Sequence, residues 1–197
     1  MSQVKITGNA SGTGVLTIAA PNTNTDRSIT LPDKAGAIAV GAGTIVQVVQ
    51  ASTTTEVNVQ STTYTDTTLT ASITPTSSSN KILVIVNQTF QLYRSSGGNN
   101  GGGIRILRDS TAIYTPMTVS AGPLTEYHGV GTSMAKEDFT NTVIHYLDSP
   151  ATTSSVTYKT QGRVYVTTNG SRIRFQYGVG TTVDGRSDII LMEVVAW

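Results

Sequence analysis

The chain has 197 residues, a formal net charge of +1 and charged side chains at 13% of its positions. So few cationic side chains argue against a nucleic-acid partner, because duplex binding draws on many Lys and Arg contacts to phosphate. The absence of cysteine excludes both a disulfide framework and a zinc site built on thiolates.

The N-terminal sequence lacks the apolar stretch of a secretory signal. The longest uncharged apolar run is the five residues Ile82 to Val86, whereas a membrane-spanning helix needs about 20. We therefore expect a chain that is made in the cytoplasm and has no membrane insertion.

Composition favours β-structure. About one residue in six is Thr, whose branched Cβ suits a half-buried pleated surface and restricts the side chain in a helix. No window of helical length carries apolar residues with a 3.6-residue period, while alternating runs bounded by Gly, Pro, Asn or Asp recur. The least strand-like stretch is Ser133 to Phe139, for which we expect one turn at most. The sequence predicts an all-β fold.

Residues 1–43 read as a small N-terminal module. Two short strands are expected, Val15 to Ala19 and Ser28 to Leu31, followed by turn chemistry at Pro32. The module holds too few apolar side chains to be stable alone, so it should pack on the main domain, on a sister chain or on another protein.

Residues 44–197 are predicted to form a two-sheet antiparallel sandwich or jelly roll, because roughly ten strands follow one another with turn signals between them. Lys81 to Tyr93 reads as a long central strand. The expected strands are Ile45 to Gln50, Thr54 to Gln60, Leu69 to Thr74, Lys81 to Tyr93, Ile104 to Leu107, Ala112 to Tyr114, Asn141 to Leu147, Ser155 to Lys159, Arg163 to Thr167, Arg172 to Tyr177 and Ile189 to Trp197.

Three connections carry distinct signals. A hairpin is expected around Arg108 to Ser110, and a second around Asn169-Gly170, because a type I′ turn needs positive φ at both central residues. The glycine-rich run Ser95 to Gly103 lacks the Lys-Ser/Thr of a phosphate-binding loop, and we expect a mobile exposed loop there.

Several stretches resemble proteins of tailed-bacteriophage virions, those of marine and cyanobacterial phages especially. The segment Gly14 to Val40 resembles a strand and turn module that recurs in tail-fibre and other virion proteins. Thr65 to Gln88, Tyr146 to Gln161 and the terminal strand resemble a C-terminal β domain of the same group. Relatives of this kind are commonly trimeric fibres, head fibres or other structural proteins. No extended fibre shaft is present here, which is a departure from long fibres.

The resemblance implies a non-enzymatic fibre-type subunit in the virion, assembled in the host cytoplasm as a homotrimer with other virion proteins as partners. The N-terminal module would anchor it, and the β-sandwich would be exposed, where it could bind host-surface glycan. A capsid-decorating protein without a receptor role is the first alternative, and a polysaccharide-active enzyme is the second. The predicted virion-attachment residues are Leu16, Ile18, Pro21, Ile29, Leu31 and Pro32.

Candidate catalytic chemistry is sparse. His128 and His145 are the two histidines, and His145 alternates with apolar residues in an expected strand. Scattered carboxylates could be considered for glycan cleavage, but they read as turn or solvated-loop residues. We predict no catalytic, metal or cofactor-binding residues; the carboxylates weighed are Glu126, Glu137, Asp138, Asp184 and Asp188.

Two further sites are predicted. Arg172 and Arg174 alternate on one face of the expected second hairpin, with Arg163 on its other strand, and this basic strip suits an anionic glycan or an acidic neighbour. Trp197 ends an apolar strand, so it and Val195 are predicted at the oligomer interface. Strand edges with little charge also favour a homo-oligomer.

Overall fold

The computed structural model describes residues 42–116, 118–119, 122–123, 125–128, 135–178 and 185–196, together with Ser11, Thr13 and Asn24. Backbone contacts divide the chain into two units, Met1–Ile38 and Ala39–Trp197. Both expected N-terminal strands lie outside the described residues, so the fold presented below is that of the second unit.

This unit is built from two antiparallel sheets packed as a sandwich, together with a short two-stranded ribbon. Sheet A, with six strands, contains β1 (Ile45–Thr53), β2 (Val57–Val59), β4 (Lys81–Arg94), β10 (Lys136–Asp148), β12 (Arg172–Phe175) and β13 (Ser187–Val194). Sheet B, with five, contains β3 (Thr65–Ile73), β5 (Asn100–Arg108), β6 (Thr111–Tyr114), β9 (Glu126–His128) and β11 (Val156–Val164). The ribbon pairs β7 (Thr118–Val119) with β8 (Gly122–Pro123). The two-sheet antiparallel sandwich predicted from the sequence is therefore confirmed.

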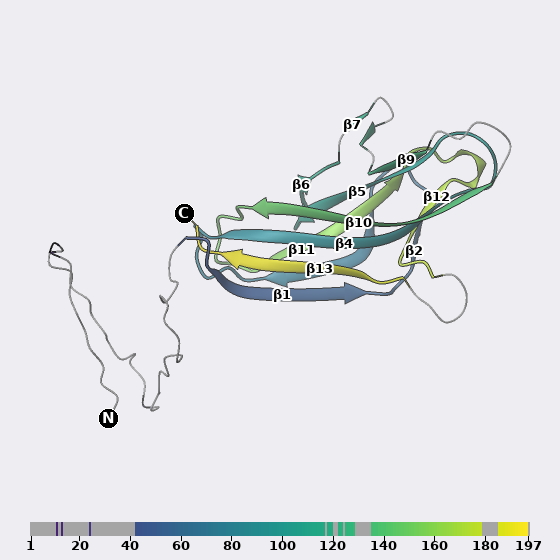
Figure 1. The fold of residues 1–197 in the computed structure, drawn as a ribbon. Helices are drawn as coiled ribbons and strands as arrows, with labels where there is room; N and C mark the ends of the chain where they lie inside the picture. Colours follow the sequence, from purple (N-terminus) through teal and green to yellow (C-terminus); the bar gives the residue numbers. More distant parts are fainter. Residues whose placement is uncertain are drawn as a thin grey trace. The chain divides into compact units, whose positions relative to one another are not determined.

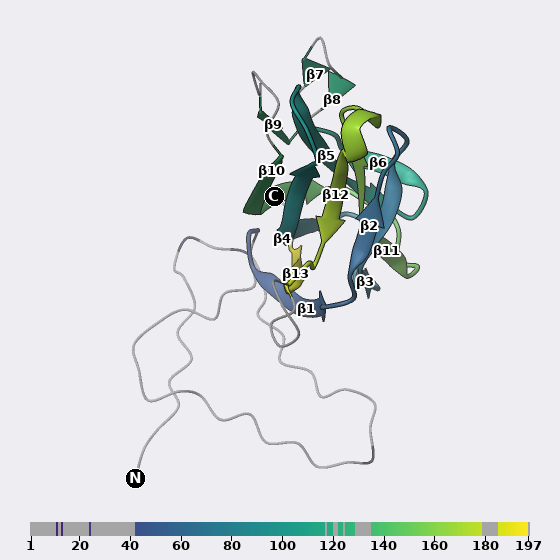
Figure 2. The same ribbon diagram turned by 90° about the vertical axis from the view of Figure 1, so that its right-hand side faces the viewer.

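Strand β4 is the centre of sheet A. Along one edge it pairs with β13 and then with β12, and along the other edge it pairs with β10 over its whole length. Strand β13 in turn lies between β4 and β1, so the terminal strand is internal to the sheet. Figure 1 shows β10, β4, β13 and β1 side by side, and Figure 2 shows the same strands turned by 90°.

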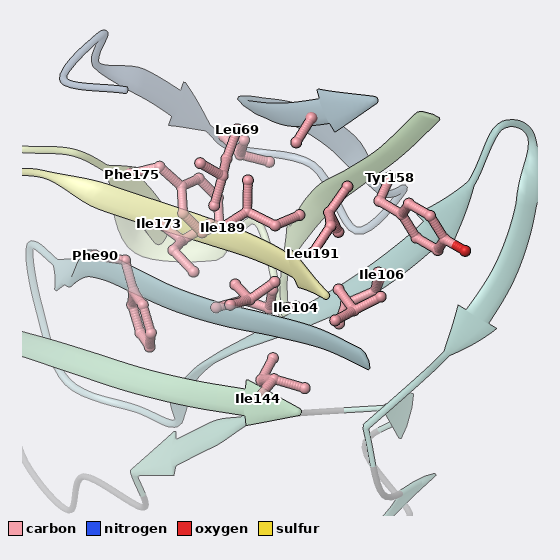
Figure 3. Close-up of a cluster of buried hydrophobic side chains, with 14 of the residues drawn as sticks. Leu69, Phe90, Ile104, Ile106, Ile144, Tyr158, Ile173, Phe175, Ile189 and Leu191 are labelled. Carbon is pink, nitrogen blue, oxygen red and sulfur yellow. The ribbon is translucent and has the colours of Figure 1, made fainter. Parts of the chain in front are cut away.

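The core lies between the sheets, because alternate side chains of each strand point inward. In β4 the inward side chains include Ile82, Val84 and Val86, all fully buried, and they face Ile104 and Ile106 of β5. Figure 3 shows side chains from both sheets in this core, among them Phe175 of sheet A and Tyr158 of sheet B. Burial of each such side chain stabilises the fold by about 1.5–3 kcal/mol.

The glycine-rich segment is part of this packing, and the predicted mobile loop is wrong for its second half. Asn100 to Gly103 begin β5 and are buried. A Cβ at Gly102 would lie 2.8 Å from Cδ1 of Ile173 and 3.0 Å from Cδ2 of Leu92. These glycines allow the two sheets to approach closely, which is a reason for glycine unrelated to mobility.

The second hairpin is also wrong as predicted. Asn169 and Gly170 do have positive φ, of 54° and 65°. However, the turn Thr168–Gly170 is a single 3₁₀ turn that leads from β11 in sheet B to β12 in sheet A. The favourable turn residues are therefore used to cross between sheets. The first hairpin, around Arg108 to Ser110, is confirmed as β5–β6.

One stretch that looked unlike a strand is in fact one. Lys136 to Phe139 form the start of β10, although the sequence predicted at most one turn there and a solvated loop at Glu137-Asp138. Pairing with the far end of β4 stabilises these residues in extended form, and no periodicity within so short a segment indicates that partner. In the described part of the chain, no helix has the length and apolar character needed to cross a membrane.

Candidate functional site on the outer face of the six-stranded sheet

The outer face of sheet A, which points away from sheet B, carries rows of apolar side chains. Residues paired across antiparallel strands point to the same side, so the registers align side chains into rows. One row is apolar across four strands and consists of Val48, Met192, Leu83 and Leu147. Together with adjacent members it forms what we call the apolar rows: Ile45, Val48, Leu83, Ile85, Val143, Leu147, Ile190, Met192 and Val194.

Four members of the apolar rows are exposed in the single chain, and the other five are half-buried. Val143 is 64% exposed, Val48 56% and Leu147 38%. The row that contains Ile190 and Ile85 ends in Gln50 and His145, so the row through Val48 and Leu147 is the one that is apolar across all four strands. Exposed apolar groups gathered on one face mark contact surfaces. The arrangement is therefore suited to binding another apolar surface.

The rows end at an open sheet edge. Among the described residues, β10 pairs with β4 alone, so the other edge of this 13-residue strand has no partner strand. Its charges are confined to its two ends, at Lys136 to Asp138 and at Asp148. Natural sheets usually protect long edges with charge, so an edge of this type favours pairing or close contact with another protein.

Asp148 fixes the end of β10 against sheet B. Its carboxylate accepts hydrogen bonds from Nη1 of Arg108, at 2.8 Å, and from the hydroxyl of Tyr158, at 2.7 Å. Burial, together with this bond to a carboxylate, raises the pKa of Tyr158, which keeps the hydroxyl protonated as a donor. One end of the strand that forms the open edge is therefore bonded to sheet B.

The other end of the outer face carries an aromatic–arginine cluster, which we define as Gln91, Tyr93, Phe139, Arg172, Arg174 and Tyr177. The guanidinium carbon of Arg172 lies 3.9 Å from the ring centre of Tyr93, and that of Arg174 lies 4.4 Å from that of Tyr177. The ring of Tyr177 stacks on that of Phe139, with centroids 6.0 Å apart and planes at 18°. These contacts hold two cations on a flat aromatic surface.

The predicted basic strip is divided by the fold. Arg172 and Arg174 do lie together on sheet A, but Arg163 lies on β11 and points outward from sheet B. Its guanidinium carbon is 5.8 Å from the ring centre of Tyr64. The prediction that all three arginines form one strip is wrong because it rested on the incorrect hairpin.

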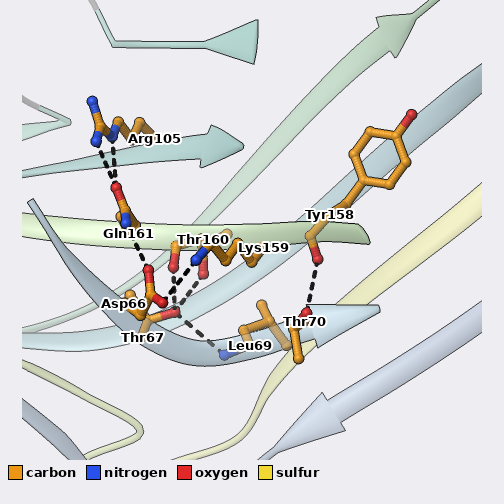
Figure 4. Close-up of polar contacts among 9 residues, drawn as sticks. All are labelled: Asp66, Thr67, Leu69, Thr70, Arg105, Tyr158, Lys159, Thr160 and Gln161. Carbon is orange, nitrogen blue, oxygen red and sulfur yellow. Dashed lines mark hydrogen bonds and ion pairs between the residues drawn. The ribbon is translucent and has the colours of Figure 1, made fainter. Parts of the chain in front are cut away.

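Sheet B has an outer face of a different kind, covered by polar side chains that bind one another. Nε2 of Gln161 donates to Asp66, and Oε1 of Gln161 accepts from Arg105 at 2.6 Å, as Figure 4 shows. Lys159 forms an ion pair with Asp66 at 2.9 Å. The hydrogen bond from Lys159 is the main cause that lowers the pKa of Asp66.

A polar layer crosses the core at the level of Gln88. Its Nε2 donates to Oγ of Ser187 at 2.8 Å, and its Oε1 accepts from Thr160. The hydroxyl of Thr160 is also bonded to that of Thr67. With the amide of Gln176 oriented to accept from Gln88 and Ser187, its nitrogen donates to the backbone carbonyls of residues 55 and 67. This fully bonded layer fixes the register between the sheets.

Glu193 is the one buried carboxylate of the terminal strand. Burial alone would raise its pKa, but hydrogen bonds donated by Asn80, Gln47 and Thr76 lower the pKa to about 2. The hydroxyl and the backbone N–H of Thr76 both donate to Oε1, at 2.8 and 2.7 Å. The ionised group thus ties β13 to β1 and to the connection between β3 and β4, which is a structural role.

The carboxylates weighed for catalysis do not come together among the described residues. Asp188 accepts two bonds from Arg186, and Asp138 forms an ion pair with Lys136 at 3.2 Å. His145 is exposed on β10, beside the apolar rows. Within the described ranges no group of three or more His, Asp or Glu is placed to hold a metal ion. Asp184 lies outside these ranges.

The remaining predicted residues are at the two ends of the chain. Val195 exchanges backbone hydrogen bonds with the segment before β1: its N–H donates to Thr44, and its carbonyl accepts from Gly43. Trp197 and the six predicted virion-attachment residues, Leu16, Ile18, Pro21, Ile29, Leu31 and Pro32, lie outside the described residues.

Sequence reasoning did not find Gln91, Tyr93, Phe139 and Tyr177 as site residues. The sequence did carry a signal for the apolar rows, because the run Ile82 to Val86 is apolar on both faces and so requires cover on both. The spacing of Phe139, Val143 and Leu147 by four residues was a second signal, because it places all three on one face of a strand.

Neither a protein-family model nor a characterised protein sequence matches this chain. Among solved structures it is similar to dimeric latent PorU from Porphyromonas gingivalis, with a TM-score of 0.29 and 10% identity. The match covers 80% of this chain and 14% of that one. A likeness this weak carries no argument about fold or function.

Proposed function

We propose that the chain is a non-enzymatic structural subunit of a tailed-phage virion, of the fibre type, and that it works as a homotrimer assembled in the host cytoplasm. The observation that carries the assembly part is the set of apolar rows on sheet A. An apolar face that stays exposed in one copy is covered when copies pack around a symmetry axis. The virion part rests on the sequence resemblance.

The topology is compatible with this role. The order β1-β13-β4-β10 in sheet A and β3-β11-β5-β6 in sheet B supports a jelly roll, a fold with two Greek keys that recurs in viral structural proteins. The N-terminal module, residues 1–43, would attach the subunit to other virion proteins. The sandwich would then be exposed, with its aromatic–arginine cluster directed toward host-surface glycan.

Light scattering of the purified full-length chain tests the assembly. We expect a mass near three times 20.7 kDa at micromolar concentration, and we expect the backbone N–H groups along the open edge of β10 to be protected from hydrogen exchange. A monodisperse monomer would contradict the homotrimer, and a trimer with an unprotected β10 edge would contradict the proposed interface.

Particle imaging tests the virion role. Gold-labelled antibody against the sandwich should decorate intact particles of the source phage at a fixed position. Labelling of fibres would support the fibre-type subunit, and labelling spread over the capsid shell would favour a decorating protein. The absence of label on particles whose lysate contains the chain would contradict a virion role.

A further inference from the structure

Two neighbouring glutamines of β4 are equally buried but have opposite surroundings. Gln88 and Gln91 are both 0% exposed. The inward Gln88 uses its amide nitrogen and its amide oxygen in hydrogen bonds. The outward Gln91 lies in register between Phe139 and Arg174, and among the described residues neither of its amide atoms has a partner.

An unpartnered buried amide is costly, and the fold offers no compensation for Gln91. An apolar side chain of similar shape would fill the same space without that cost. The amide lies within the aromatic–arginine cluster, where Nε of Arg172 is also buried without a partner in the described part of the chain. Both a donor and an acceptor thus lie without a hydrogen-bond partner directly beneath a surface that holds two cations.

We propose that the aromatic–arginine cluster binds an acidic saccharide. The carboxylate of a uronic acid would bind the guanidinium groups of Arg172 and Arg174, and a sugar ring would lie on Phe139, which is 51% exposed. The guanidinium fork matches a carboxylate, and its position is preset by contact with Tyr93 and Tyr177. This inference rests on the proposed function, because it names the glycan class that the exposed sandwich would meet.

The surrounding charges fix the direction in which the ligand lies. Glu137 is exposed on β10, opposite Tyr93, and would repel an anion on that side. Arg172 and Arg174 lie on the opposite side of β4, on β12. Phe139 and Arg174 are separated by one intervening strand, hence by about 10 Å across the sheet. A carboxylate on the β12 side with a neighbouring sugar on the β10 side satisfies both requirements.

Isothermal titration calorimetry on the full-length protein tests the site. The probe is a tetrasaccharide of alternating glucuronic acid and N-acetylglucosamine, and the uncharged control is a tetrasaccharide of N-acetylglucosamine alone. We expect the acidic probe to bind at least tenfold more tightly. Equal affinities for the two, or no binding of the acidic one, would overturn the inference.

Three variants localise the effect. Arg174→Gln should weaken binding of the acidic probe at least tenfold, while the matched Arg163→Gln, on the opposite sheet, should leave it unchanged. Gln91→Leu should weaken binding several-fold with an unchanged or raised melting temperature. Equal losses in the two arginine variants, or a lowered melting temperature in Gln91→Leu, would overturn the inference. Oligomer mass and particle labelling are independent of these results, so failure here is distinguishable from failure of the proposed function.

Discussion

The two outer faces of the sandwich differ in whether their side chains find bonding partners within one copy of the chain. On sheet B, the side chains of Arg105, Gln161, Asp66 and Lys159 bind one another within one copy. On sheet A, the apolar rows stay exposed and the amide of Gln91 stays unpartnered among the described residues. This difference is the reason for placing both proposed contacts, the one between copies and the one with glycan, on sheet A.

The largest effect is expected when a charge is placed in the apolar rows, which tests whether sheet A forms the contact between copies. Val48→Lys should dissociate the proposed homotrimer to single chains, because the ammonium group would be buried in each of its apolar contacts. The matched change Ser72→Lys, at an exposed position of β3, should leave the mass unaltered. Light scattering at equal concentrations measures both, and dissociation by Ser72→Lys alone would assign the interface to sheet B.

The next test compares the two buried glutamines of β4. We expect Gln91→Leu to leave the free energy of unfolding unchanged, because the amide of Gln91 has no hydrogen-bond partner among the described residues. Gln88→Leu should lower the free energy of unfolding by about 3 kcal/mol, since it leaves Ser187, Thr160 and the amide of Gln176 with unpaired polar atoms. Urea denaturation of the two variants checks this. Similar losses for both would mean that Gln91 also has a structural role.

Acid should destabilise the end of sheet A on which the apolar rows lie. The pKa of Glu193 is lowered from 4.5 to about 2, so its stabilising contribution is complete above pH 4.5 and is lost as the pH falls toward 2. We expect a loss on the order of 2 kcal/mol from this group. In Glu193→Gln that part of the pH dependence should disappear. An unchanged slope between pH 4.5 and 2 in the variant would contradict the assignment.

The smallest effect is expected on the outer face of sheet B. The ion pair between Lys159 and Asp66 is exposed to solvent, and such pairs contribute about 0.2–1 kcal/mol. Lys159→Ala should therefore change the free energy of unfolding by less than about 1 kcal/mol and should not alter the oligomer. A larger loss would show that this face contributes more to the fold than its surface contacts indicate.

Local patterns predicted most strands but not their pairing. Alternation along Lys81 to Tyr93 and along the terminal strand identified β4 and β13, because burial on one face leaves a period of two in the sequence. The Asn169-Gly170 turn was recognised, yet its use as a crossing between sheets depends on β2 and β4, which lie far away in sequence. The cluster around Gln91 could not be predicted for the same reason, since it combines three strands.

The position of β13 has a consequence for the order of events in the cell. Because this strand lies between β1 and β4, sheet A has a gap in its middle until residues 187–194 have left the ribosome. Nascent chains on one polysome therefore cannot present a finished apolar surface to their neighbours. In the proposed homotrimer, association of copies would follow the insertion of β13, which separates folding from assembly in time.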